Sequence, residues 1–583
     1  MPRLRLALAQ TNPIVGDLSG NVEAVVAAAH RAAEAGADVM LAGEMVISGY
    51  PIEDLAAQPS FLRDAHDAVA ALASRLEAEG LGDLVVVVGY PDGPFEPRLL
   101  GTSNAPTAIA QNAAAVLQHG AVQARYAKHH LPNYSVFDEY RIFIPGDELL
   151  VLRVTRPGEA AADVALIVCE DLWRDGGPVG RVLQADAGLL LVINASPFER
   201  DKDDVRLPLV TRRAEETDTI VAYVNIVGGQ DDLVFDGDSV VVDGHGTILG
   251  RAPQFREHLL VVDVDPAEAT DTPLPEDVAR VELALPSRRA TPDIPRDVAV
   301  LPDDREQLWN ALVLGLRDYV EKNRFPSVVL GLSGGIDSSV VAALATDALG
   351  PDRVFGISLP SRYSSAGSKD DAKDLGDRLG VHFTTQPIAD FVQPIEDALQ
   401  LSGTAAENVQ ARIRGLIWMA ESNMHGHLAL TNGNKTEVAV GYSTIYGDAA
   451  GGFAPIKDVP KTLVWELARW RNEHARSRGE LEPIPAASIE KPPSAELRPD
   501  QTDQDTLPPY ELLDAILELY VTRRLGRDDI VAQGFDHDTV YFVAKLVDQS
   551  EWKRRQGAIG PKISGMAFGR DRRLPITYRP NLG

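Results

Sequence analysis

The segment that most constrains the fold is an apolar stretch, residues 327–332, that continues directly into Ser333-Gly334-Gly335-Ile336-Asp337-Ser338-Ser339. Two adjacent glycines allow a backbone to approach an anion closely, and the free amides at the start of a following helix bind it. Around this loop, apolar spacing predicts helices at 305–322, 339–349 and 365–379 and strands at 353–359 and 381–385. Such regular alternation is typical of a doubly wound parallel sheet.

The polar residues of this loop indicate a phosphate group and a cation. Ser333, Ser338 and Ser339 offer hydroxyl donors, whereas the carboxylate of Asp337 would repel phosphate unless a divalent cation lay between them. Asp337 therefore predicts Mg²⁺, which binds proteins through one or two carboxylates together with substrate phosphates. The chain contains no G-x-x-x-x-G-K-[ST], so the loop is not the lysine-bearing P-loop. The alternative is an ordinary glycine turn that caps a helix.

The first half of the chain contains a less regular mixture of elements. Apolar runs predict strands at 3–10, 37–43, 83–89, 164–169, 188–194, 220–226 and 233–242. Helical spacing occurs at 21–35 and 61–79, and turns at 119–120 and 244–246 predict two hairpins. These elements favour an α/β or α+β domain of stacked layers.

A proline-rich segment separates the two halves. Six prolines recur between residues 267 and 304, where neither a helical nor a strand periodicity holds. This composition is typical of a linker that wraps a surface. We therefore expect one domain at 1–266, a linker at 267–304 and a second domain at 305–583, which suits a chain of 583 residues.

Charge and cysteine content exclude several classes of protein. The net charge of −29 disfavours binding to nucleic acid backbones and anionic lipid surfaces. The lone cysteine, Cys169, cannot build a disulfide framework or a zinc site, which favours a reducing compartment. The sequence contains neither a signal-peptide core nor a run of about 18 apolar residues. We expect a soluble, cytoplasmic protein with no nucleic acid or membrane partner.

Three polar residues near the ends of predicted strands supply the groups that nucleophilic chemistry needs. Cys169 ends the strand 164–169, Glu44 follows the strand 37–43, and Lys128 follows the hairpin strand 121–127. A thiol nucleophile needs a base, and the oxyanion that it generates needs a positive charge. Taken alone, a cysteine after an apolar run is more often a small buried hydrophobe. Glu44 and Lys128 could equally form a salt bridge at a strand end.

These residues stand in motifs that resemble a known family. The first half resembles the nitrilase-superfamily amidases at Gly43-Glu44-Met45, Lys128-x-x-Leu131-Pro132-Asn133-Tyr134, Cys169-Glu170-Asp171-Leu172-Trp173 and Asn194-Ala195-Ser196-Pro197. The loop 333–338 resembles the SGGxDS loop of the ATP pyrophosphatases. Together the two halves resemble the glutamine-dependent NAD⁺ synthetases, a likeness that extends to residues 407–414, 431–437, 446–448, 491–497 and 551–556. The resemblance implies a nitrilase-like αββα sandwich followed by a Rossmann-like, doubly wound domain.

The resemblance also implies two reactions. In a glutaminase site, Cys169 would be the nucleophile, Glu44 the base, Lys128 the oxyanion partner and Glu139 an additional catalytic glutamate. A synthetase site would use ATP and Mg²⁺ to amidate deamido-NAD⁺ through an adenylated intermediate, giving NAD⁺, AMP and diphosphate. Ammonia from glutamine would pass between the sites through an internal tunnel, in an enzyme that assembles as a homo-oligomer.

The same resemblance assigns the binding residues. Glutamine would be bound by Tyr134, Glu170, Ser196 and Lys202. ATP would be bound by Gly331, Ser333, Gly334, Gly335, Asp337, Ser338, Ser339, Thr431 and Lys461. Deamido-NAD⁺ would be bound by Asn408, Arg412, Arg414, Asn434, Lys435, Glu437, Asp448 and Lys553, and Mg²⁺ by Asp337 and Glu437. The sequence departs from the family pattern at Asp201, where glycine is usual, and at Thr436, where serine is commoner.

Three other functions share features with this sequence. A glutamine-fed ATP pyrophosphatase that amidates a different acceptor fits the loop equally well. A tRNA-modifying pyrophosphatase that transfers sulfur needs a cysteine beside the loop and a basic face, and this chain has neither. A non-catalytic scaffold with a nucleotide sensor would lack site residues, yet Glu44, Lys128, Cys169, Asp337 and Glu437 are all present.

Overall fold

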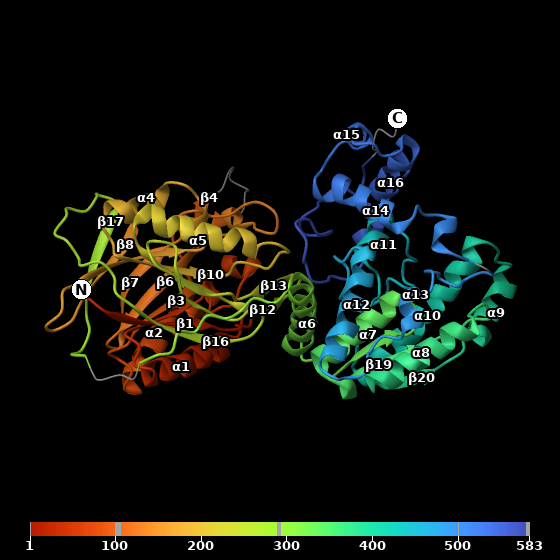
Figure 1. Ribbon diagram of the computed structural model, residues 1–583, viewed down its shortest axis with the longest axis horizontal. Helices are drawn as coiled ribbons and strands as arrows, with labels where there is room; N and C mark the ends of the chain where they lie inside the picture. Colours follow the sequence, from red (N-terminus) through yellow and green to blue (C-terminus); the bar gives the residue numbers. More distant parts are fainter. Residues whose placement is uncertain (1, 100–106, 289–292, 500, 579–583) are drawn as a thin grey trace. The chain divides into compact units, whose positions relative to one another are not determined.

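The computed structural model describes residues 2–99, 107–288, 293–499 and 501–578. They form two compact units. One comprises the described residues of Met1–Gln230 and Phe235–Leu301, and the other those of Asp231–Val234 and Pro302–Gly583. Both units mix helices with strands (Figure 1), which confirms the predicted α/β class.

The first unit is built mainly on two large sheets. One has six strands in the order β16 (His258–Val264), β1 (Leu4–Gln10), β2 (Val39–Ala42), β3 (Val85–Asp92), β6 (Gln111–Gln118) and β7 (Ala121–Ala127). The other has seven strands in the order β15 (Ile248–Arg251), β14 (Val240–Val242), β11 (Ile220–Asn225), β10 (Leu189–Asn194), β9 (Ala162–Val168), β8 (Leu149–Thr155) and β17 (Val278–Ala284). Strands β1–β2–β3 are parallel, as are β9–β10–β11, so their carboxyl ends meet at one edge of each sheet.

Alternating side chains explain the layers of this unit, because successive residues of a strand point to opposite faces. Leu6 and Leu8 of β1 and Leu41 of β2 are buried in a core shared with the second sheet. The intervening residues, such as Ala7 and Met40, pack instead against helices α1 (Leu18–Glu34) and α2 (Pro59–Ala78). Helices α4 (Gly177–Gln184) and α5 (Asp203–Thr217) pack against the second sheet. The predicted αββα sandwich is confirmed (Figure 1).

Two local predictions for this unit were wrong. The predicted strand 233–242 is divided into β13 (Leu233–Asp236) and β14, because Gly237 and Asp238 have left-handed φ angles of 73° and 59°. Residues 278–284, where prolines indicated no regular structure, form β17 and pair in parallel with β8. As an edge strand with only one neighbour, β17 lacks the apolar run that marks a buried strand. The two predicted hairpins are confirmed as β6–β7 and β14–β15.

The second unit is built on four parallel strands, in the order β20 (His382–Thr385), β19 (Val354–Ser358), β18 (Val328–Gly331) and β21 (Leu428–Ala429). The chain runs outward from β18 through β19 to β20 and then returns to place β21 on the other side of β18. This arrangement confirms the predicted doubly wound sheet. Strands β18 and β21 form its topological switch point, where such sheets bind ligands.

Helices cover this sheet and extend the unit beyond it. Helix α7 (Ile336–Leu349) contacts β18 and β19, α8 (Ala366–Leu379) contacts β19 and β20, and α10 (Thr404–His425) contacts β18 and β21. The other helices are α6 (Asp304–Lys322), α9 (Ala389–Leu399), α11 (Lys435–Val440), α12 (Lys461–Ser477), α13 (Ala486–Glu490), α14 (Tyr510–Leu517), α15 (Arg527–Val531), α16 (His537–Gln549) and α17 (Glu551–Arg554). Among the described residues, no helix has the length and apolar character needed to cross a membrane.

Candidate functional site

The first unit places Glu44 and Cys169 at the carboxyl ends of parallel strands. Cys169 directly follows β9, and Glu44 lies two residues beyond β2. Both are tied to the end of β10, since the amide of Cys169 donates to the Ile193 carbonyl (3.0 Å) and the amide of Glu44 to the Asn194 carbonyl (3.3 Å). Cys169 has a φ of 46°, a strained conformation that costs about 1–3 kcal/mol in a residue with a side chain. Such strain persists only where the surrounding structure holds the residue in one geometry.

Lys128 is the centre of a buried ion cluster. Its Nζ lies 2.7 Å from Oε1 of Glu44 and 2.8 Å from Oε2 of Glu139, and all three side chains are at most 3% exposed. The Glu44 carboxylate also accepts hydrogen bonds from Nδ2 of Asn112 (2.6 Å) and from the amide of Ala195 (2.8 Å). The salt bridge that the sequence left open is therefore formed, and it holds the predicted base beside the predicted oxyanion partner.

Two residues of this cluster, Asn112 and Tyr50, were not predicted from the sequence. Nδ2 of Asn112 lies 3.5 Å from Oε1 of Glu139, and the Tyr50 hydroxyl donates to the same oxygen at 2.9 Å. Asn112 is a fully buried amide at the start of the apolar strand β6, which is a signal that sequence inspection can find. Tyr50 gives no such signal.

The charges of this site are set by burial. Burial, and then the neighbouring charge of Glu44, raise the pKa of the Cys169 thiol well above its usual range. Burial opposes the charge of Lys128, yet the carboxylates of Glu139 and Glu44 outweigh it and raise the pKa of this ammonium group. At neutral pH the thiol is therefore protonated and Lys128 is charged. A reaction at the thiol would need a base, and the Glu44 carboxylate lies near enough to contribute to this pKa shift.

The buried charge of Lys128 leads to a prediction about stability. Lys128→Met leaves Glu44 and Glu139 buried without their cation, so we expect the free energy of unfolding to fall by about 3–5 kcal/mol. A suitable control is Arg212→Ala in the same unit, because Arg212 is 49% exposed and its ion-pair partners lie 3.6 and 3.7 Å away. This control should change stability by less than about 0.5 kcal/mol. Equal losses in urea unfolding of the two variants would contradict the role of the cluster.

Glu139 makes stability depend on pH. Burial raises its pKa from 4.5 to about 7, although Lys128 opposes the rise. The folded state then keeps a proton that the unfolded state loses, so this stabilising contribution is complete below pH 4.5 and disappears as the pH rises through 7. We expect the unfolding free energy of the wild type, relative to Glu139→Gln, to fall by about 2 kcal/mol between about pH 5 and pH 8. Urea unfolding of both proteins at both pH values measures this difference, and a constant difference would contradict the prediction.

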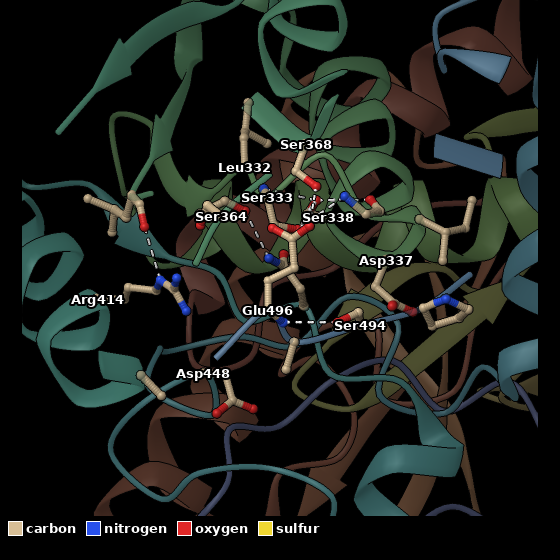
Figure 2. A pocket seen from close by; sticks show the side chains of 18 of the residues that line it. Leu332, Ser333, Asp337, Ser338, Ser364, Ser368, Arg414, Asp448, Ser494 and Glu496 are labelled. Atoms are coloured by element: carbon tan, nitrogen blue, oxygen red, sulfur yellow. Dashed lines mark hydrogen bonds between the residues drawn. The ribbon is translucent and has the colours of Figure 1, made fainter. Parts of the chain in front are cut away.

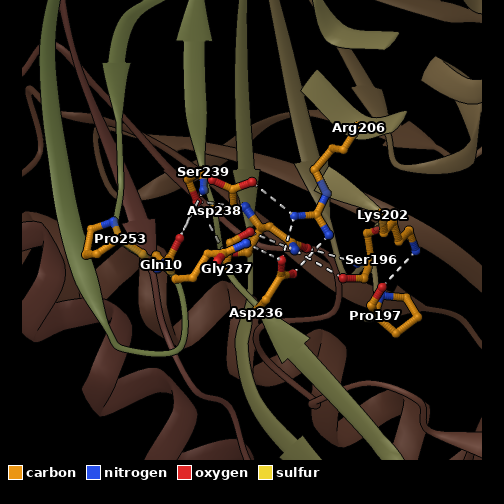
Figure 3. A network of polar contacts seen from close by, with 12 residues as sticks. Gln10, Ser196, Pro197, Lys202, Arg206, Asp236, Gly237, Asp238, Ser239 and Pro253 are labelled. Atoms are coloured by element: carbon orange, nitrogen blue, oxygen red, sulfur yellow. Dashed lines mark hydrogen bonds and ion pairs between the residues drawn. The ribbon is translucent and has the colours of Figure 1, made fainter. Parts of the chain in front are cut away.

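Of the four residues predicted to bind glutamine, Tyr134 and Glu170 contact each other directly. The Tyr134 hydroxyl donates to Oε2 of Glu170 at 2.9 Å. Ser196 and Lys202 come from one loop (Figure 3), in which Nζ of Lys202 donates to the Pro197 carbonyl at 2.7 Å. Burial lowers the pKa of Lys202 to about 8, so this amine is still mainly charged at neutral pH.

A second buried ion network begins at Arg206, four residues after Lys202. Arg206, on α5, donates to both carboxylate oxygens of Asp236 at 2.9 Å, and it lies 3.4 Å from Asp238 (Figure 3). Arg251 in turn forms a two-bond pair with Asp238 at 2.7 and 2.9 Å. Such fully buried, hydrogen-bonded pairs fix the loop geometry even where their net contribution to stability is small.

The second unit contains a pocket of about 280 Å³ at the switch point of its sheet (Figure 2). Its walls include the loop after β18, the loop after β21 and the segment 491–497. Ten of the predicted residues line it: Gly331, Ser333, Gly335, Asp337, Ser338, Arg414, Thr431, Glu437, Asp448 and Lys461. The loop that most constrained the sequence analysis therefore lies at the pocket, as a phosphate-binding role requires.

The other seven predicted residues of this unit do not line the pocket: Gly334, Ser339, Asn408, Arg412, Asn434, Lys435 and Lys553. Nζ of Lys435 is bound by Oγ of Ser564 (2.6 Å) and by Asp458 (3.0 Å). Nζ of Lys553 donates to two backbone carbonyls, those of Gly441 and Ser443. These side chains connect segments of the second unit in this structure, and their role in binding stays a prediction.

Asp337 and Glu437 converge on one ammonium group. Nζ of Lys461 lies 2.5 Å from Oδ2 of Asp337 and 3.3 Å from Oε1 of Glu437. Asn434 orients both acids, because its Nδ2 donates to Asp337 (2.9 Å) while its Oδ1 accepts from the Glu437 amide (3.0 Å). Burial raises the pKa of Glu437 to about 8. This carboxyl group therefore keeps its proton to a higher pH than an exposed glutamate does.

The pair Asp337 and Glu437 suits Mg²⁺, which takes one or two carboxylates from a protein and its remaining ligands from phosphate and water. Within the described parts of the chain, no group of three or more His, Cys, Asp or Glu side chains is arranged to hold a metal ion. A cation at this pair would therefore depend on substrate oxygens for the rest of its coordination.

Glu496, which the sequence analysis did not single out, lies in the middle of the pocket wall (Figure 2). Its Oε1 accepts from the hydroxyls of Ser368 (2.7 Å) and Ser365 (3.0 Å) at the start of α8. Lys491, five residues earlier in the same segment, donates to the Ser368 hydroxyl at 3.0 Å. The only sequence signal for these residues was that 491–497 resembles the family.

Comparisons with known proteins find relatives for both halves of the chain. The carbon-nitrogen hydrolase model matches residues 5–274, and the NAD synthase model matches residues 308–557. Glutamine-dependent NAD(+) synthetases of Rhodobacter capsulatus and Aquifex aeolicus are 45% and 42% identical, and the alignments cover 99% of this chain and of each relative. The structure of the Acinetobacter baumannii enzyme, in complex with ADP, is 36% identical with a TM-score of 0.71, over 99% of this chain and 98% of that one.

Proposed function

The chain belongs to the glutamine-dependent NAD(+) synthetase family, and we propose that it converts deamido-NAD⁺ to NAD⁺ through an adenylated intermediate, with ammonia released from glutamine. The observation that carries this proposal is the pocket of the second unit, where Asp337 of the 333–338 loop and Glu437 share Lys461 at the switch point. We assign glutamine hydrolysis to residues 1–266 and synthesis to residues 305–583. The extents of the two matched families support this division.

In the glutaminase site, the protonated thiol of Cys169 would transfer its proton to Glu44 as its sulfur bonds to the side-chain carbonyl carbon of glutamine. The charged Lys128 would stabilise the oxyanion of the tetrahedral intermediate. When the carbon–nitrogen bond breaks, the proton held by Glu44 passes to the leaving ammonia. Water then hydrolyses the thioester to glutamate and restores the thiol. Tyr134, Glu170, Ser196 and Lys202 would hold the glutamine backbone.

In the synthetase site, a nicotinate carboxylate oxygen would attack the α-phosphate of ATP and release diphosphate. Ser333, Ser338 and the amides at the start of α7 would hold the departing phosphates. Asp337 and Glu437 would hold Mg²⁺, which when bound neutralises charge on the triphosphate. Lys461 would supply further positive charge. Ammonia then attacks the acyl carbon, and AMP leaves.

Ammonia is mostly protonated at neutral pH and is then not a nucleophile. Ammonia released into bulk water would be protonated before it could react. We therefore propose a water-excluding internal path between the two reactions. The resemblance to the family also leads us to propose a homo-oligomer, which analytical ultracentrifugation of the purified protein tests.

The proposed function is tested by measuring AMP release with Mg-ATP, glutamine and deamido-NAD⁺, against a matched reaction that lacks the dinucleotide. We expect AMP and NAD⁺ to appear in equal amounts only when deamido-NAD⁺ is present. ATP cleavage that is indifferent to deamido-NAD⁺, with glutamine hydrolysis intact, would show that the acceptor is a different carboxylate.

A further inference from the structure

Asp171 is a fully buried carboxylate beside the nucleophile, and none of the roles described above uses it. It lies two residues after Cys169, in the short helix α3 (Glu170–Trp173), and is 0% exposed. A buried carboxylate is costly unless hydrogen-bond donors surround it. The hydrogen-bond donors to Asp171 come from two separate segments of the chain.

The first set of donors belongs to the segment that carries Lys128. Oδ1 of Asp171 accepts from the backbone amides of His129 (3.1 Å) and His130 (2.7 Å), the two residues that directly follow Lys128. Oδ2 accepts from the hydroxyl of Tyr126, two residues before Lys128, at 2.7 Å. The carboxylate thus binds the chain on both sides of the lysine.

The other donor belongs to the turn that carries Cys169. Oδ2 accepts from the amide of Val168 at 3.3 Å, so that Asp171 closes the turn across the strained cysteine. The ring Nδ1 of His130 lies 3.4 Å from Oδ1, and it adds an ion pair only when that ring is protonated. A single carboxylate therefore links the backbone of the lysine segment to the backbone of the nucleophile turn.

We propose that Asp171 is a positioning residue for glutamine hydrolysis, which sets the separation between the Lys128 ammonium and the Cys169 sulfur. The proposal rests on the roles of Cys169 and Lys128 given under the proposed function. A carboxylate is required because its two oxygens offer about four acceptor sites. An asparagine amide of the same shape presents an NH₂ group to donors, so one set of backbone amides would lose its partner.

The test compares Asp171→Asn with the wild type in glutamine hydrolysis and in ammonium-driven NAD⁺ synthesis. A displacement of about 1 Å between reacting groups costs roughly a hundredfold in rate. We therefore expect kcat for glutamine hydrolysis to fall by about a hundredfold, with KM for glutamine changed by less than about threefold. Alkylation of Cys169 by iodoacetamide should slow, whereas ammonium-driven synthesis should stay at the wild-type rate. An unchanged kcat would overturn the proposal.

Two further variants separate positioning from stability. Val164→Ala removes a buried side chain from β9 without touching the carboxylate, and we expect it to retain kcat while it lowers resistance to urea. An equal loss of kcat in Val164→Ala and Asp171→Asn would overturn the proposal. Tyr126→Phe deletes a single bond to Asp171, and should lower kcat by about three- to tenfold. If Asp171→Asn does not fold, an unchanged kcat in Tyr126→Phe overturns the proposal instead.

The proposed function itself is checked separately by Cys169→Ala. If this variant keeps glutamine hydrolysis, the nucleophile has been misassigned and the proposed function fails. If Cys169→Ala abolishes hydrolysis while Asp171→Asn leaves it unchanged, only the positioning role of Asp171 fails.

Discussion

Cys169→Ala is expected to lower glutamine-driven NAD⁺ synthesis by at least about a thousandfold while ammonium-driven synthesis stays within about twofold of the wild type. The thiol is the only sulfur nucleophile in the chain, and the variant removes it without removing a hydrogen bond of the Glu44–Lys128 cluster. The second reaction needs only ammonia, so external ammonium should replace the lost glutaminase. NAD⁺ formation with each nitrogen source, measured at saturating ATP, gives the two rates.

Cys169 is buried in the main core of its unit, so the control for this variant is a test that it still folds. Circular dichroism and urea unfolding should show that Cys169→Ala keeps its structure. Loss of both activities in a folded variant would contradict the separation of the two sites. Retention of glutamine-driven synthesis would exclude Cys169 as the nucleophile.

Asp337→Asn is expected to impair NAD⁺ synthesis and to leave glutamine hydrolysis intact. The substitution keeps the shape of the side chain but removes one carboxylate from the pair around Lys461. Since that pair would hold Mg²⁺, we expect NAD⁺ synthesis to fall by at least about a hundredfold with glutamine or ammonium as the nitrogen source. Glutamine hydrolysis, assayed as glutamate release without ATP, should persist.

Asp347→Asn provides a matched control on the same helix, α7. Asp347 binds Trp309 and Arg471 outside the pocket, so the same chemical change there should leave NAD⁺ synthesis within about twofold. If Asp337→Asn retained NAD⁺ synthesis, the metal assignment would be wrong. It would also be wrong if Asp347→Asn lost as much synthesis as Asp337→Asn and raised Mg²⁺ did not change the activity of Asp337→Asn.

Much of the fold could be predicted because its signals are local. The strand, glycine loop and helix at 327–349 are encoded within one short segment, and the hairpin at 119–120 is encoded by its own turn. The edge strand β17 was missed because its signal is not local. Its pairing with β8 joins residues more than a hundred positions apart, and its own composition has no buried run that would indicate a strand.

The candidate sites show the same division between local and distant information. Residue types at strand ends pointed to Glu44, Lys128 and Cys169, but no spacing could show that Asn112 would bind Glu44, that Tyr50 would bind Glu139, or that Asp171 would bind the segment after Lys128. Lys435 and Lys553 were predicted to bind substrate by resemblance, yet in this structure Lys435 binds Ser564 and Lys553 binds the Gly441 carbonyl.

The sequence by itself determined the α/β layers and the strand, glycine-rich loop and helix at residues 327–349, because these signals depend on residues within about 20 positions of one another. The tertiary structure alone decided which acids share Lys128, which share Lys461, and which carboxylate ties the nucleophile turn to the lysine segment. Those contacts join side chains from elements far apart in the sequence, among them helices α7, α11 and α12 around Lys461. Their distances follow from how strands and helices pack, and packing is a property of the whole core rather than of any one segment.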